Sequence, residues 1–212
     1  MAAVIACVFA LFPLVYALSA SLSPTGSLLG SNDLFAEITG ANYRNLLNDP
    51  QNPFLTWFGN SMLISSITAV GTVLMGAAAA YAFSRFRFRF RRGGLMSLLI
   101  IQMFPQLLAF VAIFLLLFSI SEVYPFLGLN SRMGLVAVYL GGALGANTFL
   151  MYGFFNTIPR DLDEAATLDG ASHSQIYWTI ILPLVTPILV VVGMLSFIAS
   201  FSDFLLAQIV LQ

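Results

Sequence analysis

Five stretches of this chain, each longer than 20 residues, hold only one charged side chain between them, Asp203. A helix needs about 20 apolar residues to cross the hydrocarbon core of a membrane. None of the stretches alternates apolar and polar residues as a membrane β-strand does. The sequence therefore predicts an all-α, polytopic transmembrane helical bundle. The predicted spans are 2–22, 57–83, 95–120, 133–155 and 180–206.

The composition excludes several classes of protein. Charged residues make up 8% of the chain, whereas a soluble domain has about a quarter. All eight basic residues are arginines, so the lysine of a phosphate-binding P-loop is missing. Cys7 and His173 are each the single residue of their type and cannot supply a zinc site. We therefore expect no catalytic residue, no metal site and no bound cofactor, and the net charge of −1 argues against a nucleic-acid partner.

The arginines predict which side of the membrane each loop faces. Five of the eight lie between Ser84 and Arg92, in the segment SRFRFRFRR. Short loops that are rich in arginine stay on the cytoplasmic side. The segment 84–94 is therefore expected inside, and alternation of the spans places 156–179 inside as well. A nucleic-acid-binding strand would also alternate Arg and Phe, but a topology signal with interfacial phenylalanines explains the pattern more simply.

The same alternation sets the expectation for the other loops and for the two ends. Segments 23–56 and 121–132 are expected outside, together with the C-terminal end. The residues Ala17–Ala20 resemble a signal-peptide cleavage site, but no positive charge precedes them, so we expect a first transmembrane helix there. An outward C-terminal end after five spans is unusual for a complete transporter. We therefore also expect that at least one helix is missing from this sequence.

A polar, acidic segment interrupts the apolar pattern between the fourth and fifth predicted spans. Asp161 and Glu164 have the D-x-x-E spacing of a capping box, in which two side chains bond each other's backbone amides. Gly170 lies where a left-handed residue would end such a helix. The sequence predicts a helix of about two turns from Leu162 to Asp169. A helix this short is not stable alone and must pack against a partner.

This segment belongs to a longer pattern with the spacing E-A-A-x3-G-x9-I-x-L-P. Its fixed positions are Glu164, Ala165, Ala166, Gly170, Ile180, Leu182 and Pro183. The pattern resembles the EAA signature of permease subunits of binding-protein-dependent ABC importers. The first span, the segment YLGGALGANTFLMYGFFNTIPRDLDEAATLDGAS and the ending LSFIASFSDFLLAQIVL extend the resemblance over effectively the whole chain. They are most similar to carbohydrate permeases of the maltose/maltodextrin type.

The resemblance implies a fold, a set of partners and roles for individual residues. The fold would be that of a type I ABC importer permease, with five helices present of six. The segment 156–179 would hold a coupling helix that docks on a cytoplasmic ABC ATPase dimer, which carries ATP and Mg on its own chains. A second permease subunit and an extracytoplasmic sugar-binding protein would complete a multi-pass complex in a bacterial inner (plasma) membrane. The implied coupling residues are Glu164, Ala165, Ala166, Asp169, Gly170, Leu182 and Pro183.

Uncharged polar residues inside the predicted spans are candidates for a sugar path. Polar groups in lipid-spanning helices are costly and therefore face a cavity or another helix. Bonding between neighbouring helices is the alternative explanation for each of them. The candidates are Gln102, Gln106, Asn147, Ser196 and Ser200.

Other functions fit the sequence less well than a sugar permease. An ion-coupled secondary transporter places ionisable groups in the middle of the membrane, whereas Asp203 lies near the outer end of its span. A membrane enzyme would need paired catalytic groups, and the acidic residues at 161–169 are explained by the start of a helix. The resemblance therefore implies a permease for maltose or maltodextrin, with trehalose or another oligosaccharide as the alternative substrate.

Overall fold

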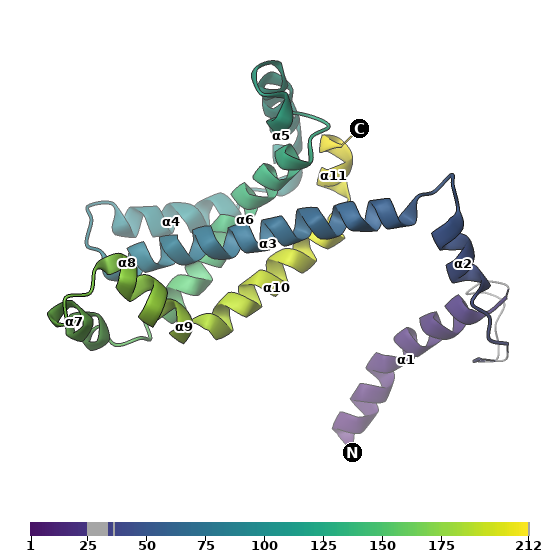
Figure 1. The fold of residues 1–212 in the computed structure, drawn as a ribbon, viewed down its shortest axis with the longest axis horizontal. Helices are drawn as coiled ribbons and strands as arrows, with labels where there is room; N and C mark the ends of the chain where they lie inside the picture. The colour runs from purple at the N-terminus through teal and green to yellow at the C-terminus, as the bar shows by residue number, and fades with distance from the viewer. Residues whose placement is uncertain (25–33, 36, 212) are drawn as a thin grey trace. The chain divides into compact units, whose positions relative to one another are not determined.

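The part of the chain that the structure describes is built from helices, which confirms the all-α prediction (Figure 1). The computed structural model describes residues 1–24, 34–35 and 37–211, apart from the side chains of Ala2, Ala3 and Gln106. The chain divides into two compact units, Met1–Asn60 and Ser61–Gln212. The helices are α1 (Ala2–Leu22), α2 (Ala41–Asn48), α3 (Phe54–Arg85), α4 (Arg91–Gln102), α5 (Gln106–Val123), a 3₁₀ turn (Pro125–Leu127), α6 (Arg132–Phe155), α7 (Asp161–Leu168), α8 (His173–Gln175), a π-helical turn (Ile176–Ile181), α9 (Leu182–Leu184), α10 (Thr186–Ser202) and α11 (Leu205–Val210).

In the first unit, the short helix α2 closes the carboxyl end of α1. The last carbonyl groups of a helix have no partner within the helix itself. Nδ2 of Asn42 donates to the carbonyl oxygens of Ser21 and Ser23, at 3.0 and 2.8 Å. The hydroxyl groups of Ser21 and Tyr43 share a further hydrogen bond of 2.7 Å. The polar residues that follow the first apolar stretch thus satisfy the end of α1.

Three helices of the described chain are long and apolar enough to cross a membrane: α1 from Val4 onward, α3 and α6. Charged residues limit the apolar stretches of α3 and α6, because Arg85 ends α3 and Arg132 begins α6. Two further pairs pass the same test as bent pairs, α4 with α5, and α8 and α9 with α10. If each bent pair is one span, the number of candidate spans rises to five.

The range 95–120, expected as one straight helix, is two helices that meet at an angle of 102°. Helix α4 ends at Gln102, and α5 begins after Pro105, whose backbone is extended (ψ 115°). Proline has no amide hydrogen to donate, and it disfavours the helical conformation of the residue before it. The apolar composition continues through this point, but the hydrogen-bond ladder does not, so the expectation of a single helix was wrong.

The range 180–206 is also broken. A bend of 78° at Val185 separates α9 from α10, near Pro183 and Pro187, and α10 ends at Ser202. Asp203 has extended backbone (ψ 122°), and its Oδ1 accepts a hydrogen bond from the amide of Leu206 at 3.0 Å. This carboxylate therefore satisfies the start of α11, so the expected fifth helix ends before its predicted boundary.

Two clusters of buried apolar side chains form the core of the second unit. In lipid, helices associate through close packing, because lipid tails are as apolar as the side chains. Gly76 on α3 shows this closeness, since a Cβ atom there would lie 2.3 Å from Cε of Met151 on α6. The cluster nearer to α7 includes Ala80, Tyr81, Met151, Phe155, Ile176, Ile181 and Val192. The other cluster consists of Ile64, Leu117, Leu135, Val136 and Val210.

Candidate functional site

The signature segment folds into the two-turn helix α7, but its amino end differs from the expectation. The expected capping box of Asp161 and Glu164 does not form, because Arg160 is the N-cap residue and already has helical backbone angles. The amide of Glu164 donates to the carbonyl oxygen of Arg160 at 3.0 Å. Asp161 thus lies inside the first turn. Together with Asp163 and Glu164, it places negative charge at the positive end of the helix dipole.

The carboxyl end of α7 is the left-handed glycine turn that the sequence predicted. Gly170 has φ +85°, a conformation that glycine adopts without steric cost. The amide of Gly170 donates to the Thr167 carbonyl at 3.0 Å, and the amide of Ala171 donates to the Ala166 carbonyl at 2.9 Å. These two bonds form a complete Schellman motif. The turn reverses the chain immediately after Leu168 and fixes where α7 ends.

The two faces of α7 have different surroundings. Ala166 is buried against the first core cluster. Glu164, Ala165 and Asp169 are exposed, and Leu168 keeps 89% of its surface accessible at the tip of the segment. A single exposed leucine is ordinary. Here it adjoins an alanine and two carboxylates on one helix, and together they form a small surface suited to a protein partner.

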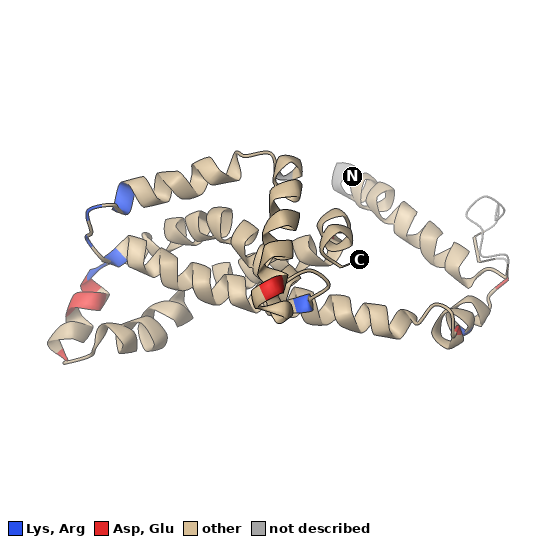
Figure 2. Cartoon of the chain, turned by 90° about the horizontal axis from the view of Figure 1, so that it is seen from above, with Lys and Arg blue, Asp and Glu red and all other residues tan. Residues whose placement is uncertain are grey.

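The buried side of α7 lies against the carboxyl end of α3. Figure 2 shows blue and red segments close together at this end of the unit. Nε of Arg85 lies 3.0 Å from Oδ2 of Asp163, and the two side chains are 7% and 19% exposed. The contact is an ion pair without the direction of a hydrogen bond, and among the described residues neither Asp163 oxygen accepts one. Arg85 and Asp163 are thus a largely desolvated charge pair.

Hydrogen bonds in both directions reinforce this contact. Nη2 of Arg85 donates to the carbonyl oxygen of Ile158 at 3.2 Å, and Nη2 of Arg160 donates to the carbonyl oxygen of Ser84 at 2.8 Å. Oγ of Ser84 donates to Oδ1 of Asn156 at 3.0 Å. The pattern of arginines predicts only the topology of the chain. These contacts are not predicted, because no spacing signal joins residues so far apart along the chain.

Aromatic rings pack beneath the residues that follow α7. The ring centroid of Tyr81 lies 5.0 Å from that of Tyr177, and Phe86 and His173 meet edge to face at 5.4 Å. Ser172 and Gln175 form a capping box, which is the reciprocal arrangement expected at the start of α7. A capping signal was thus present in the segment, but it starts α8.

The remaining signature positions lie where the chain turns toward α10. Leu182 is half-buried and packs against the first core cluster, whereas Pro183 is exposed. The π-helical turn Ile176–Ile181 lies directly before them. Such turns are rare and occur frequently at functional sites, and no pattern in the sequence predicted this one.

Most of the candidates for a sugar path bond to the protein itself. Nε2 of Gln102 donates to the Gly142 carbonyl at 2.7 Å, which joins α4 to α6. Nδ2 of Asn147 donates to Oγ of Ser196 at 3.1 Å, which joins α6 to α10. Oγ of Ser200 donates within α10, to the Ser196 carbonyl at 2.8 Å. The side chain of Gln106 lies outside the described part of the structure. The hydrogen bonds of Gln102, Asn147 and Ser196 therefore fit the alternative explanation, in which polar residues join neighbouring helices.

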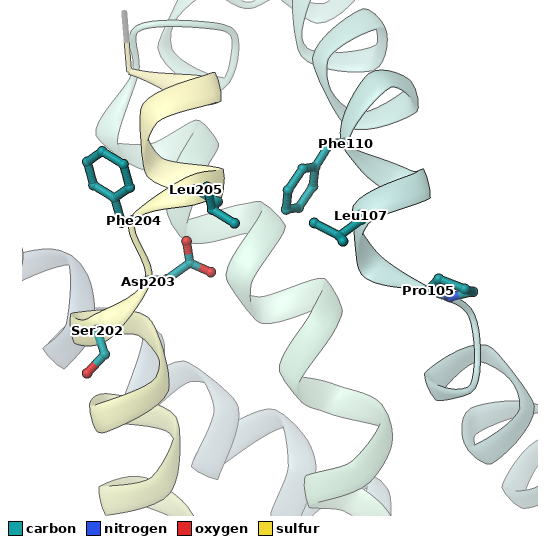
Figure 3. Close-up of a pocket in the computed structure, with 7 residues that line it drawn as sticks. All are labelled: Pro105, Leu107, Phe110, Ser202, Asp203, Phe204 and Leu205. Atoms are coloured by element: carbon teal, nitrogen blue, oxygen red, sulfur yellow. The ribbon is translucent and has the colours of Figure 1, made fainter.

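The break at Pro105 and the junction of α10 and α11 face each other across an open pocket of about 590 Å³ (Figure 3). One wall comes from the start of α5 and the other from the junction of α10 and α11. Among the described residues of the lining, which are mostly apolar, the side chain of Asp203 carries the only charge. The lining residues are Pro105, Leu107, Phe110, Ser202, Asp203, Phe204 and Leu205.

Comparisons with known proteins agree on one group of relatives. Residues 72–212 match the family model described as "Binding-protein-dependent transport system inner membrane component". The chain is 37% identical over 206 residues to the galactooligosaccharides transport system permease protein GanQ of Bacillus subtilis (strain 168), which covers 97% of this chain and 71% of GanQ. It is 38% identical over 214 residues to the maltose/maltodextrin transport system permease protein MalG of Yersinia pestis, which covers 95% and 70%.

A solved structure gives the same result for the fold. It is the crystal structure of a bacterial ABC transporter involved in the import of the acidic polysaccharide alginate. The match has a TM-score of 0.83 at 26% sequence identity and covers 98% of this chain and 71% of that chain.

Proposed function

The chain belongs to the family of binding-protein-dependent transport system inner membrane components, and we propose that it is the permease subunit of an ATP-driven importer that takes an oligosaccharide into a bacterial cell. It would form half of the translocation path, with a second permease subunit forming the other half. A cytoplasmic ABC ATPase dimer would supply the energy, and an extracytoplasmic binding protein would deliver the sugar. Maltose or maltodextrin and galactooligosaccharides are the first candidate substrates, because the relatives MalG and GanQ belong to transport systems for these sugars.

One observation carries the proposal of a coupling role: α7 is a capped helix with one face anchored in the core and the other exposed. The anchored face holds Ala166 and Asp163, and the exposed face holds Glu164, Ala165 and Leu168. A helix of two turns has too few internal hydrogen bonds to be stable alone. Its fixed position and its free carboxylate are what a surface for docking a separate, basic ATPase cleft requires. We therefore propose that Glu164 pairs with a cationic side chain of the ATPase.

Charge reversal at Glu164 tests the docking role. Glu164→Lys is expected to leave the permease inserted and folded, because the side chain is exposed and makes no core contact. Losing an interfacial charge pair of this kind costs about 2–5 kcal/mol, so the ATPase should fail to copurify with the permease. Copurification from detergent-solubilised membranes measures this directly.

Glu122 provides a matched control for that experiment. It is also an exposed glutamate next to the end of a helix, α5, but it lies in the segment 121–132, which is predicted to face outward. Glu122→Lys should therefore copurify with the ATPase as the unchanged chain does. Normal ATPase binding and normal uptake in Glu164→Lys would sink the coupling assignment for α7.

The substrate is tested by uptake into proteoliposomes that contain the permease pair and the ATPase, with binding protein and ATP on their respective sides. Labelled maltose should be taken up. Competition by unlabelled maltodextrin, galactooligosaccharide or trehalose then ranks the alternative substrates. Uptake should require ATP and persist when ionophores collapse the ion gradients. Uptake that follows an ion gradient and ignores ATP would contradict the proposal of an ABC importer.

A further inference from the structure

The charge pair beneath α7 is unusual for its surroundings. The free-energy cost of desolvating two charges can exceed the Coulombic gain of pairing them. A buried ion pair is therefore weak evidence of a purely stabilising role. Arg85 and Asp163 are 7% and 19% exposed, and in the described structure the carboxylate oxygens accept no hydrogen bond that would offset the cost. What such a pair does provide is a defined relative position, because either charge without the other would be left unpaired inside the protein.

The hydrogen bonds around the pair favour that positional interpretation. Arg85, the last residue of α3, reaches the Ile158 carbonyl in the segment that leads into α7. Arg160, the N-cap residue of α7, reaches back to the carbonyl of Ser84 in the last turn of α3. Guanidinium groups are favourable at this end of α3, where unpaired carbonyls carry the negative end of the helix dipole. Each helix end thus holds the other by a charged side chain.

We propose that Arg85 and Asp163 are positioning residues that fasten the coupling helix α7 to α3, so that movement imposed on α7 by the ATPase passes directly into α3. This inference rests on the proposed function. It gives α7 a connection to the membrane helices in addition to those along the chain, which run back into α6 and forward into α10. The added connection runs through the ion pair into a 32-residue helix.

The structure also indicates why the connection along the chain into α10 is less direct than the ion pair. Between α7 and α10 the backbone passes the glycine turn at Gly170, the π-helical turn and the 78° bend at Val185. Each of these interrupts the regular α-helix, so no single helix axis joins α7 to α10. The contact between Arg85 and Asp163 contains no flexible backbone, and it acts on the end of an uninterrupted helix.

Neutralising the pair tests the proposal in the complete transporter, reconstituted with its ATPase, partner permease and binding protein. The variants are Arg85→Gln, Asp163→Asn and the double variant, which leaves no unpaired charge and so guards against misfolding of either single variant. The measured quantity is the number of sugar molecules imported per ATP hydrolysed. Allosteric coupling is typically worth roughly 5- to 150-fold, so we expect this ratio to fall by about tenfold in each variant.

ATPase copurification should remain normal in all three variants, because the exposed face of α7 is unchanged. The double variant should match the worse single variant within about twofold, since both changes remove one contact. Arg87→Gln and Glu122→Gln, which neutralise exposed residues, are the matched controls and should keep the wild-type ratio. A wild-type ratio in the double variant would overturn the positioning role.

A covalent link provides the independent test. Oγ of Ser84 and Oδ1 of Asn156 are 3.0 Å apart at this contact. In a Cys7→Ser background, Ser84→Cys with Asn156→Cys would be oxidised to a disulfide. If α3 and the segment before α7 move together, the oxidised transporter should keep its ATP-dependent uptake. Loss of uptake on oxidation, restored by a reductant, would contradict the inference.

The two proposals fail in different ways. If unchanged proteoliposomes import no sugar with ATP, the proposed function is wrong. If they import sugar and the neutralised variants do so with the same yield per ATP, only the positioning role of Arg85 and Asp163 is wrong.

Discussion

Gln102 of α4 lies directly against Gly145 of α6: a Cβ atom at position 145 would lie 2.5 Å from Nε2 of Gln102. The missing side chain leaves room for the amide, which donates to the Gly142 carbonyl at 2.7 Å. Small residues let helices approach closely in lipid. Gly141, which has the small-residue spacing with Gly145, has nothing within 4 Å of such a Cβ atom. One glycine of the pair therefore permits the contact, and the other does not take part.

This difference predicts the effect of two identical substitutions. Gly145→Ala should displace the Gln102 side chain, and overpacking of this kind costs about 1–3 kcal/mol of unfolding free energy. Gly141→Ala is the control and should be neutral or stabilising by up to about 1 kcal/mol, because alanine favours helix. Thermal unfolding in detergent would compare them. Equal stabilities would show that α4 and α6 do not pack at Gly145.

The turn after α7 predicts a second effect. Gly170 has φ +85° and open space around its missing side chain, so substitution there is opposed by backbone conformation alone. Gly170→Ala should cost about 1–2 kcal/mol, whereas Gly170→Asn should cost less, because asparagine tolerates the left-handed region. In the assembled permease pair, limited proteolysis of segment 156–179 should therefore quicken by roughly 5- to 30-fold in the alanine variant. Equal rates for the two variants would contradict this account.

The bond between Asn147 and Ser196 predicts how these polar residues contribute. If they join α6 to α10, Asn147→Ala and Ser196→Ala should each lower stability by about 0.6–1.7 kcal/mol, and the double variant should lose no more than the larger single effect. The KM for sugar should stay unchanged. Ser200→Ala is the control, since that hydroxyl bonds within its own helix. A raised KM at unchanged stability would place Asn147 on the sugar path instead.

The orientation predicted from the arginines is testable by labelling single cysteines in a Cys7→Ser background. Phe88→Cys places a cysteine at an exposed position in the arginine-rich segment, and Leu168→Cys places one at an exposed position on α7. Both should react with a membrane-impermeant maleimide only from the cytoplasmic side. Gln51→Cys, in the segment 23–56, should react from the opposite side. Labelling of Leu168→Cys from outside would overturn the predicted order of the spans.

The sequence predicts the long helices well, because charged residues delimit them. Arg85 ends α3, and Arg132 begins α6, within a few residues of the predicted boundaries. The breaks are a different matter. Apolar composition counts residues, whereas the direction of a helix depends on individual backbone donors. Composition therefore does not reveal the break at Pro105, where α4 and α5 meet at an angle of 102°.

At the candidate site, local signals were more reliable than long-range ones. The left-handed turn at Gly170 follows from its position after a short helix, and the structure has it. The capping box failed because helical hydrogen bonding begins at Arg160, one residue earlier than the side-chain pattern indicates. The Arg85–Asp163 contact joins segments on either side of α4, α5 and α6. It could not be predicted, since nothing in either segment specifies the other.

That contact also sets an order of events during synthesis of the chain. The ribosome releases α3 before it makes α6 and α7, and domains form from the amino end onward. Until residue 163 emerges, the guanidinium of Arg85 has no carboxylate and must stay hydrated at the membrane surface. The end of α3 can become dry only after α6 has been inserted and has returned the chain to the same side. Closure of the pair therefore has to follow the synthesis of α6 and the start of α7.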